Sequence, residues 1–305
     1  MFKVLVLLLL PTLVFASGVS GCQSKPEAVL PAQTPNTDAS TNEFKVLAEG
    51  FHSSVTYPFV AVVRDAETYA ELTKLDSSVP PLDTEFFRGN AVIAAYLGTR
   101  NTGGYGVEIR REGTPGVDYP SPARAVISIA EKMPGKDVMV PQMVTSPFKI
   151  VSVRVNGMAP LFLSLDVVWR KQQQMYRIAS GSFTMTGGFI GTSEQFAPHG
   201  EILVMRAGNL ASYSISLAAS GATRERFLAD FATGTVQTDG RININSLSAD
   251  LFVDKPNSGL KAIGSFQSGE NKMFLDLRSL PTMVADGYQG QGHLEANLVA
   301  AESKP

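Results

Sequence analysis

Cysteine is almost absent from this sequence, since the one copy among 305 residues is Cys22. A single cysteine forms no disulfide within the chain and supplies no paired-cysteine metal site. Histidine is also scarce, with three copies at His52, His199 and His293. The sequence therefore offers few of the residue types from which metal centres and proton-transfer sites are usually built.

Strong charge of either sign is lacking as well. The chain has 26 Lys and Arg residues against 28 Asp and Glu residues, which leaves a net charge of -2. No run of like charge is longer than Arg110-Arg111. Binding to nucleic acid needs clustered Lys and Arg to neutralise the phosphates. We therefore expect no nucleic-acid partner.

The sequence motifs of common hydrolases and metalloproteases are missing. Neither Gly-x-Ser-x-Gly nor His-Glu-x-x-His occurs. The pairs His199/Glu201 and His293/Glu295 would each place two side chains on one face of a strand, but neither has a third ligand close by in the sequence. We therefore expect a protein that is not an enzyme, with no catalytic residues, no metal site and no cofactor.

Apolar runs long enough to cross a bilayer as a permanent helix are missing too. The N-terminus carries Lys3, an apolar run from Val4 to Val14, and small residues that end at Cys22. This pattern is typical of a lipoprotein signal peptide over residues 1–21. The alternative is a short membrane anchor with a structural cysteine, but a spanning helix needs about 20 apolar residues.

Cys22 is the predicted lipidation site. A thiol joined to diacylglycerol, on an acylated N-terminus, carries several acyl chains and anchors a protein stably to a membrane. Gln23 follows it, at the position where Asp marks retention at the inner membrane in the usual sorting pattern. We therefore expect a chain that is lipid-anchored in the outer membrane, on the periplasmic face or at the cell surface.

Residues 22–42 are rich in Pro, Ala, Ser, Thr, Asn and Gln. This composition favours a disordered tether, because it offers too little apolar surface for a packed core. About 20 such residues have a root-mean-square reach of about 25 Å. The tether would hold a folded domain off the membrane surface.

Residues 43–158 are predicted to form a small α+β domain, an antiparallel sheet with one helix. Asp65 is placed to cap a helix from Ala66 to Leu75. The run from Ala91 to Leu97 is apolar on both faces, which indicates an interior strand. The glycine turn after it and the alternating strand Tyr105 to Arg111 predict a β-hairpin. Further strands are predicted at Tyr57 to Val63, Arg124 to Lys132 and Phe148 to Val155.

Two sequence motifs in this domain resemble those of a known family. They are Gly98-Thr-Arg-Asn-Thr-Gly-Gly-Tyr105 and Thr145-Ser-Pro-Phe148. In this order and spacing they resemble the C-terminal domain of the PrcB family, which is named for a protease-complex-associated lipoprotein. The resemblance covers about residues 43–156. It implies a non-catalytic envelope domain that associates with a protease or another partner, and it brings no catalytic residues.

The same two words supply the candidate partner-binding residues, since loops held by a rigid sheet commonly carry recognition. The alternative is that the paired glycines serve the turn alone. The candidates are Thr102, Gly103, Gly104, Tyr105, Thr145, Ser146, Pro147 and Phe148.

Residues 159–302 contain short strands separated by Gly, Asn and Asp, which predicts an all-β sandwich or barrel domain. The stretch from Thr223 to Phe231 fits a helical turn or a strand, and we favour the strand. Three words give a weak similarity to surface-lipoprotein β-barrel domains: Leu228 to Val236, Ile263 to Phe266 and Gly290 to Ala296. This similarity concerns the fold and carries no function.

The strand predicted from Phe162 to Arg170 carries the one tryptophan, Trp169. On such a strand Asp166 would face solvent, and Trp169 would pack in the core or at a sheet edge. We expect no chemistry from either side chain.

These observations together predict a mainly β protein, with an N-terminal α+β domain followed by an all-β domain. The function that they favour is a non-enzymatic bacterial envelope lipoprotein, joined to the membrane through Cys22, that binds or stabilises a partner protein. A protease complex is the partner that the resemblance suggests. The alternative is a carrier of a small apolar ligand or lipid, because a closed or sandwiched sheet can hold one.

Overall fold

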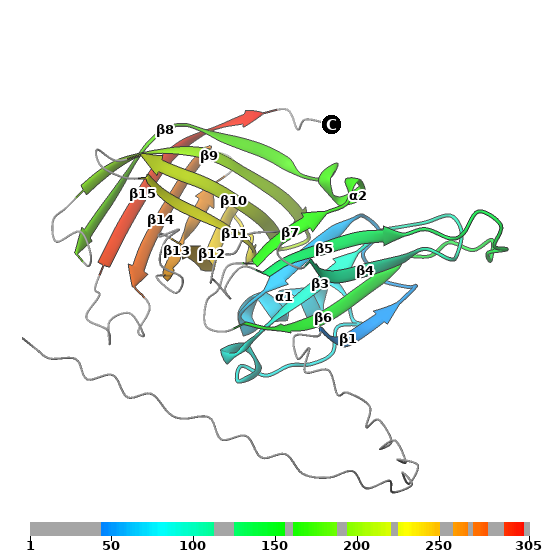
Figure 1. Ribbon diagram of the computed structural model, residues 1–305. Coiled ribbons are helices and arrows are strands. Elements are labelled where there is room, and N and C mark those ends of the chain that lie inside the picture. Colours follow the sequence, from blue (N-terminus) through cyan, green and yellow to red (C-terminus); the bar gives the residue numbers. More distant parts are fainter. Residues whose placement is uncertain are drawn as a thin grey trace, which may run out of the picture. The chain divides into compact units, whose positions relative to one another are not determined.

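The computed structural model describes residues 44–112, 125–155, 161–187, 194–220, 225–250, 259–267, 271–279 and 290–301 (Figure 1). Cys22, the predicted signal peptide, the tether and the predicted boundary at 158 and 159 lie outside these residues. Residues Asn42–Pro305 form one compact unit. The part of the chain described is mainly β-strand, with two α-helices and one 3-10 helix.

Seven strands and three short helices make up the first part of this unit. One antiparallel sheet has the order β1 (Lys45–Gly50), β6 (Phe148–Arg154), β3 (Asn90–Tyr96) and β2 (Phe59–Val63). A second sheet has the order β4 (Gly106–Glu112), β5 (Ala125–Lys132) and β7 (Leu161–Leu165), and its β5–β7 pair is parallel. The helices are α1 (Ala66–Leu75), η1 (Phe86–Arg88) and α2 (Val167–Arg170).

Strand β3 is the interior strand that its sequence predicts. The side chains from Ala91 to Tyr96 are all 0% exposed, and the strand lies between β6 and β2. A run that is apolar on both faces is stable only where both faces are covered. The core of this part therefore forms around β3.

Helix α1 begins and ends where the sequence predicts. The Asp65 carboxylate accepts a hydrogen bond from the Thr68 N–H at 2.7 Å, which satisfies a free donor of the first turn. Tyr69 and Leu72 are buried on one face of the helix. Burial raises the pKa of the Tyr69 hydroxyl to about 12, and this hydroxyl donates to the Pro80 carbonyl. The helix is thereby fixed to the loop that follows it.

The sequence predicts a β-hairpin made of Ala91 to Leu97 and Tyr105 to Arg111. This prediction is wrong. Strand β3 pairs with β2 and β6, whereas β4 pairs with β5 in the other sheet. Both edges of β3 are thus already occupied, so β4 has no edge of β3 to pair with. The Gly98 to Tyr105 segment instead crosses from one sheet to the other, with positive φ angles of 73° at Gly98 and 84° at Gly104.

The predicted strand Phe162 to Arg170 is correct only in its first part. Strand β7 ends at Leu165, and Asp166 then caps helix α2 by accepting from the Val167 N–H at 2.8 Å. Aspartate at this position favours a helix start over a continued strand. The indole N–H of Trp169 donates to the Tyr96 carbonyl at 2.8 Å, and the side chain is 0% exposed. The prediction that Trp169 packs in the core is therefore right, but the side chain is positioned by a helix.

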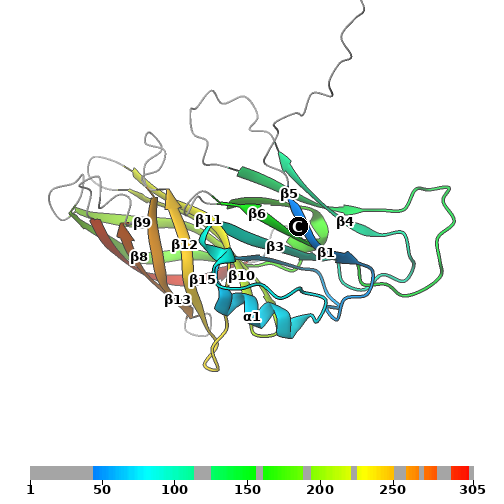
Figure 2. The same cartoon turned by 90° about the horizontal axis from the view of Figure 1, so that it is seen from below.

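The second part is a curled antiparallel sheet of eight strands (Figures 1 and 2). Its strands are β8 (Gln174–Gly187), β9 (Glu194–Ala207), β10 (Leu210–Ser220), β11 (Glu225–Thr235), β12 (Arg241–Asp250), β13 (Gly259–Gln267), β14 (Lys272–Ser279) and β15 (Gly290–Ala301). Strands β8 to β11 pair in sequence order, as do β12 to β15, and β15 pairs back to β8, so that β11 and β12 end the sheet. Between β11 and β12 the described residues form one bridge, Val236 to Ile242. The strand prediction for Thr223 to Phe231 is confirmed by β11.

Side chains alternate between a buried and an exposed face of this sheet. On β15, Leu294, Ala296 and Leu298 are 3%, 1% and 4% exposed, whereas the residues between them face solvent. This period of two is the mark of a sheet with one apolar face. The predicted fold class, mainly β with an α+β part followed by an all-β part, is therefore confirmed.

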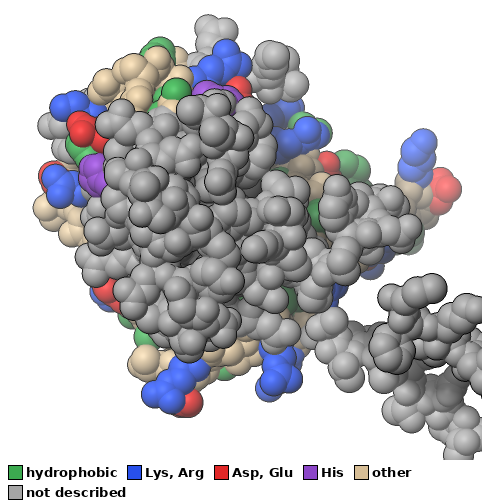
Figure 3. Space-filling model, turned by 60° about the vertical axis from the view of Figure 1, so that its left-hand side comes forward, with side chains coloured by type: hydrophobic (Ala, Val, Ile, Leu, Met, Phe, Trp, Pro, Cys, Tyr) green, Lys and Arg blue, Asp and Glu red, His purple; other side chains and the backbone are tan. Residues whose placement is uncertain are grey.

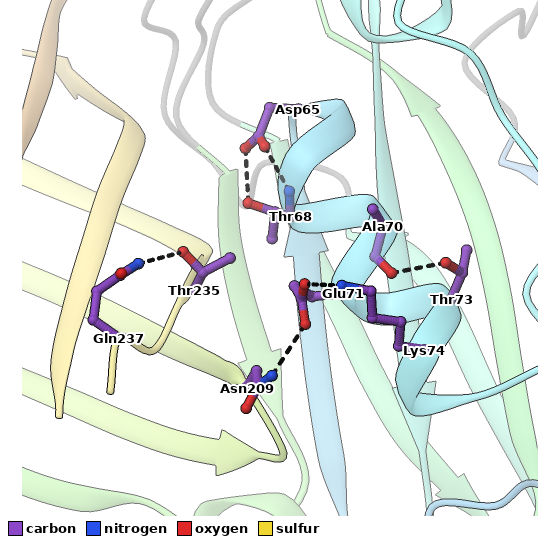
Figure 4. Close-up of polar contacts among 9 residues, drawn as sticks. All are labelled: Asp65, Thr68, Ala70, Glu71, Thr73, Lys74, Asn209, Thr235 and Gln237. Carbon is purple, nitrogen blue, oxygen red and sulfur yellow. Dashed lines mark hydrogen bonds and ion pairs between the residues drawn. The ribbon is translucent and has the colours of Figure 1, made fainter. Parts of the chain in front are cut away.

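The two parts meet along strand β2. All five β2 side chains are 0% exposed, and the Val62 N–H donates to the Thr233 hydroxyl at 2.8 Å. That hydroxyl lies 2.8 Å from the Ser212 hydroxyl, and both residues are buried. At the rim, the Asn209 amide donates to the Glu71 carboxylate on α1 at 3.3 Å (Figure 4). The outer edge of β2 is thus satisfied by side chains of the curled sheet.

Replacing the Thr233 hydroxyl tests this junction. Thr233→Val leaves the buried Val62 N–H and Ser212 hydroxyl without their partner, so we expect a loss of about 1–3 kcal/mol in the free energy of unfolding. The control is Thr73→Val, whose hydroxyl bonds the Ala70 carbonyl in an exposed position of α1 (Figure 4). It should change stability by less than about 0.5 kcal/mol. Urea unfolding followed by tryptophan fluorescence measures both, and equal effects would contradict the buried junction.

Candidate functional site

The candidate residues Thr145 to Phe148 lie inside the protein. Thr145 is 4%, Ser146 8% and Phe148 6% exposed, and Pro147 is also buried. The ring of Phe148 stacks on that of Tyr96 with centroids 6.1 Å apart. This segment therefore supports its neighbours from within, and its role in partner binding stays a prediction.

The backbone of Thr145 joins this segment to the glycine loop. Arg100 N–H donates to the Thr145 carbonyl at 2.7 Å, and Thr145 N–H donates back to the Arg100 carbonyl at 2.9 Å. The Thr145 hydroxyl adds a bond to the Thr102 carbonyl at 3.1 Å. Such a reciprocal pair of hydrogen bonds holds the two segments together in the same way as paired β-strands.

Ser146 and Pro147 make the corresponding bonds on their other sides. Ser146 N–H donates to the Phe51 carbonyl at 2.7 Å, and its carbonyl accepts from the Ser53 N–H at 3.0 Å. The Pro147 carbonyl accepts from the Leu97 N–H at 2.9 Å. Proline has no N–H to leave unpaired at this entry into β6. The segment Thr145 to Phe148 thus connects the loop at 51–53 to the loop at 98–105 through backbone hydrogen bonds.

The paired glycines bring a third loop into the same place. Gly103 N–H donates to the Pro141 carbonyl at 2.8 Å. A Cβ atom on Gly104 would lie 2.7 Å from Cγ1 of Val140 and 2.9 Å from Cβ of Pro134, and its φ angle is 84°. Glycine is required here both for close approach and for its backbone conformation. The predicted turn residues therefore hold the segment 133–144 against the glycine loop.

Arg100 closes the arrangement with an ion pair. Its Nε lies 2.9 Å from the Glu131 carboxylate, and the two side chains are 18% and 11% exposed. The guanidinium carbon also lies 5.7 Å from the centroid of the Tyr105 ring, a cation–π distance. Tyr105 is half-buried beneath it. This arginine is occupied in holding the loops together.

Exposed apolar side chains lie on two of the segments that border the glycine loop, at residues 51–57 and 133–144. We call them the loop surface: Phe51 (55% exposed), Tyr57 (39%), Met133 (68%), Val138 (62%), Met139 (99%), Met143 (47%) and Val144 (62%). Among residues whose exposure is described, three other large apolar side chains are exposed: Val46, Val167 and Val299. Figures 1 and 2 show the segment 133–144 extending past the Lys132 end of β5. Five of the seven residues belong to this segment, and such a concentration of exposed apolar side chains marks interaction sites.

The loop surface was not predicted from the sequence. Its signal lies in the segment 133–144, where three methionines and three valines alternate with Pro134, Gly135 and Pro141. The prolines prevent the segment from pairing as a strand, and so its apolar side chains cannot be buried in a sheet. Lys136 and Asp137 at its tip are also exposed and carry opposite charges.

The histidines do not come together in the described residues. His52, His199 and His293 are all exposed, and Figure 3 shows histidine side chains at separate places on one face. Glu201, the proposed partner of His199, pairs with Arg177 at 3.0 Å. No group of three or more potential metal ligands occurs in the part of the chain described. In the same part, no helix has the length and apolar character of a bilayer-spanning helix.

Gly104→Ala tests whether glycine holds the loops together. A side chain at this positive φ and close contact should cost about 1–3 kcal/mol in the free energy of unfolding. It should also speed amide hydrogen exchange at Gly103, because the bond to Pro141 is displaced. Gly106→Ala is the matched control, since its new Cβ would meet only Lys132 Cβ at 3.8 Å. Equal stability and exchange in the two variants would show that the close approach is unimportant.

A family model matches the segment that contains this arrangement. Residues 91–154 match the family described as PrcB C-terminal. The chain matches no curated protein and no solved structure. The resemblance inferred from the two sequence words is thus confirmed for this segment, whereas nothing supports the similarity of the second half to surface-lipoprotein domains. The chain is therefore similar to the PrcB C-terminal family over residues 91–154.

Proposed function

We propose that this chain is a non-catalytic lipoprotein of the bacterial envelope that binds a partner protein through the loop surface. The observation that carries the proposal is the set of exposed apolar side chains on residues 51–57 and 133–144, two segments whose backbones are bonded to the glycine loop and to Thr145 to Pro147. Apolar side chains left in water are unfavourable by roughly 25 cal/mol for each Å² that could be buried. A partner that covers them recovers this free energy.

The stiffness of the loops supports a protein partner. Binding costs less conformational entropy when the contact residues are already held in place. Here the reciprocal Arg100–Thr145 bonds and the Gly103–Pro141 bond fix the backbone beneath the exposed side chains. Methionine adapts to the shape of a facing pocket, and aromatic residues contribute a large contact area. A rigid base with adaptable tips suits insertion into an apolar recess of another protein.

The PrcB C-terminal match favours a protease complex as that partner. The matched segment runs from β3 to β6 and includes both the glycine loop and the methionine-containing loop. The charged groups beneath the surface are used within the domain, since Arg100 and Glu131 neutralise each other. We therefore propose a binding or stabilising role for these loops and no catalytic one.

Lipidation of Cys22 would give this binding role its place in the cell. A tether over residues 22–42 with a reach of about 25 Å would confine the domain to a thin layer beside the outer membrane. Confinement raises the effective concentration of a binding module toward partners in the same layer. Weak apolar contacts at the loop surface would then be sufficient.

Substitution of Val138 tests the proposed function. The full-length chain and its Val138→Asp variant are crosslinked in intact cells and the captured proteins are identified by mass spectrometry. A charge in the centre of an apolar contact should reduce capture of the main protein partner by about tenfold or more. Val299→Asp is the matched control, because Val299 is 53% exposed on β15 against 62% for Val138.

Two results would overturn the proposal. One is equal capture by the wild type, Val138→Asp and Val299→Asp. The other is an absence of protein capture together with flotation of the wild type, but not of Val138→Asp, on vesicles of phosphatidylethanolamine and phosphatidylglycerol. The second result would assign the loop surface to the bilayer.

A second candidate function is a carrier for a small apolar ligand, because a curled sheet of eight strands is a fold type that can enclose one. If this function holds, organic extraction of the natively purified chain should release an apolar compound in stoichiometric amount, detected by mass spectrometry. An extract without such a compound, from protein purified without detergent, would exclude a tightly held ligand.

A further inference from the structure

The methionines of this protein fall into two groups by exposure. Six of the ten in the sequence lie where exposure is described. Three belong to the loop surface and three are buried in the curled sheet: Met133 (68% exposed), Met139 (99%) and Met143 (47%), against Met175 (6%), Met205 (2%) and Met273 (0%). Among these six methionines, the sulfur atoms that solvent reaches most easily are therefore those at the proposed binding site.

Exposed methionine is the readily oxidised residue in this chain. A thioether is converted to a sulfoxide by peroxide or hypochlorous acid, and specific reductases convert the sulfoxide back. Buried methionines are shielded, because the oxidant must reach the sulfur. The competing thiol is Cys22 alone in the whole sequence, and it is the predicted lipidation site.

We propose that Met133, Met139 and Met143 form a reversible oxidation site that switches the loop surface off. One oxygen atom passes from hydrogen peroxide to the methionine sulfur, which is oxidised by two electrons to a sulfoxide. The peroxide is reduced to one molecule of water, and no other reactant is needed. The oxidation itself depends only on exposure, whereas its effect on binding rests on the proposed function.

The structure separates the effect on binding from any effect on folding. Met139 is 99% exposed, so the sulfoxide oxygen is hydrated in the free chain and disturbs no packing. In a complex the same oxygen would be buried among apolar groups without a hydrogen bond. Each covered sulfoxide should therefore weaken binding by about tenfold or more. A partner already bound would in turn shield the three sulfurs.

The first experiment measures oxidation in the purified full-length chain. Hydrogen peroxide is added, and peptide mass mapping follows the rate at each methionine. We expect Met133, Met139 and Met143 to be oxidised at least about tenfold faster than Met175, Met205 and Met273. The urea unfolding midpoint should stay unchanged while only the first group is oxidised. Equal rates in the two groups, or a fall in the midpoint at that stage, would overturn the oxidation site.

The second experiment measures partner capture in intact cells after a peroxide pulse. Wild-type capture should fall by about tenfold or more and recover after the pulse as reductases act. The triple variant Met133→Leu, Met139→Leu, Met143→Leu keeps the apolar volume but has no sulfur at the loop surface, so its capture, measured against its own untreated level, should not change on the peroxide pulse. The control Met205→Leu should behave as the wild type.

The outcomes distinguish the switch from the proposed function. Capture that depends on Val138 but is unaffected by peroxide, although the three sulfurs are oxidised, would overturn the switch and keep the binding role. Peroxide sensitivity that persists in the triple leucine variant would also overturn the switch. If the untreated wild type captures no partner, the proposed function fails, while selective oxidation in the purified chain still supports the modification site.

Discussion

The backbone hydrogen bonds of Thr145, Ser146 and Pro147 are the constraint on which the rest of this site depends. They join the ends of β3 and β6 to the loops at 51–53 and 98–105. Because all three residues are buried, water does not compete for these bonds. The glycine loop in turn holds the segment 133–144 through Gly103 and Gly104. One short buried segment thus positions three loops.

This constraint explains why apolar side chains remain in water. A free loop containing Met139 and Val138 would fold back and cover its own side chains. Here Pro134, Pro141 and the bonded glycine loop fix the path of the backbone, so that collapse is prevented. The same exposure that makes the surface suitable for a partner also opens its sulfur atoms to oxidants. The proposed binding role and the proposed oxidation site thus rest on one local geometry.

The curled sheet contributes to the site from a distance, by completing the sheet that supports the loops. Strand β2 is an edge strand with five fully buried side chains, and such an edge would invite pairing with other chains. Thr233 supplies the Val62 N–H with a hydroxyl acceptor in place of another strand. Met205, Leu210 and Phe231 of the curled sheet belong to the same apolar core as β3. The two parts therefore depend on each other for stability.

Features governed by neighbours in sequence could be predicted from the sequence. Asp65 and its helix, the interior strand at Ala91 to Leu97 and the PrcB resemblance all follow from local pattern and residue order. The pairing of β4 was mispredicted, because it depends on which strand edges remain free after β2 and β6 have taken both edges of β3. Likewise, the burial of Thr145 to Phe148 and the exposure of apolar side chains between Met133 and Val144 result from how strands and loops pack against one another in three dimensions. Sequence by itself determined helix α1, strand β3 and the family resemblance of residues 91–154. Only the tertiary structure decided which side of the loops meets solvent, because exposure is set by contacts between residues far apart in the chain.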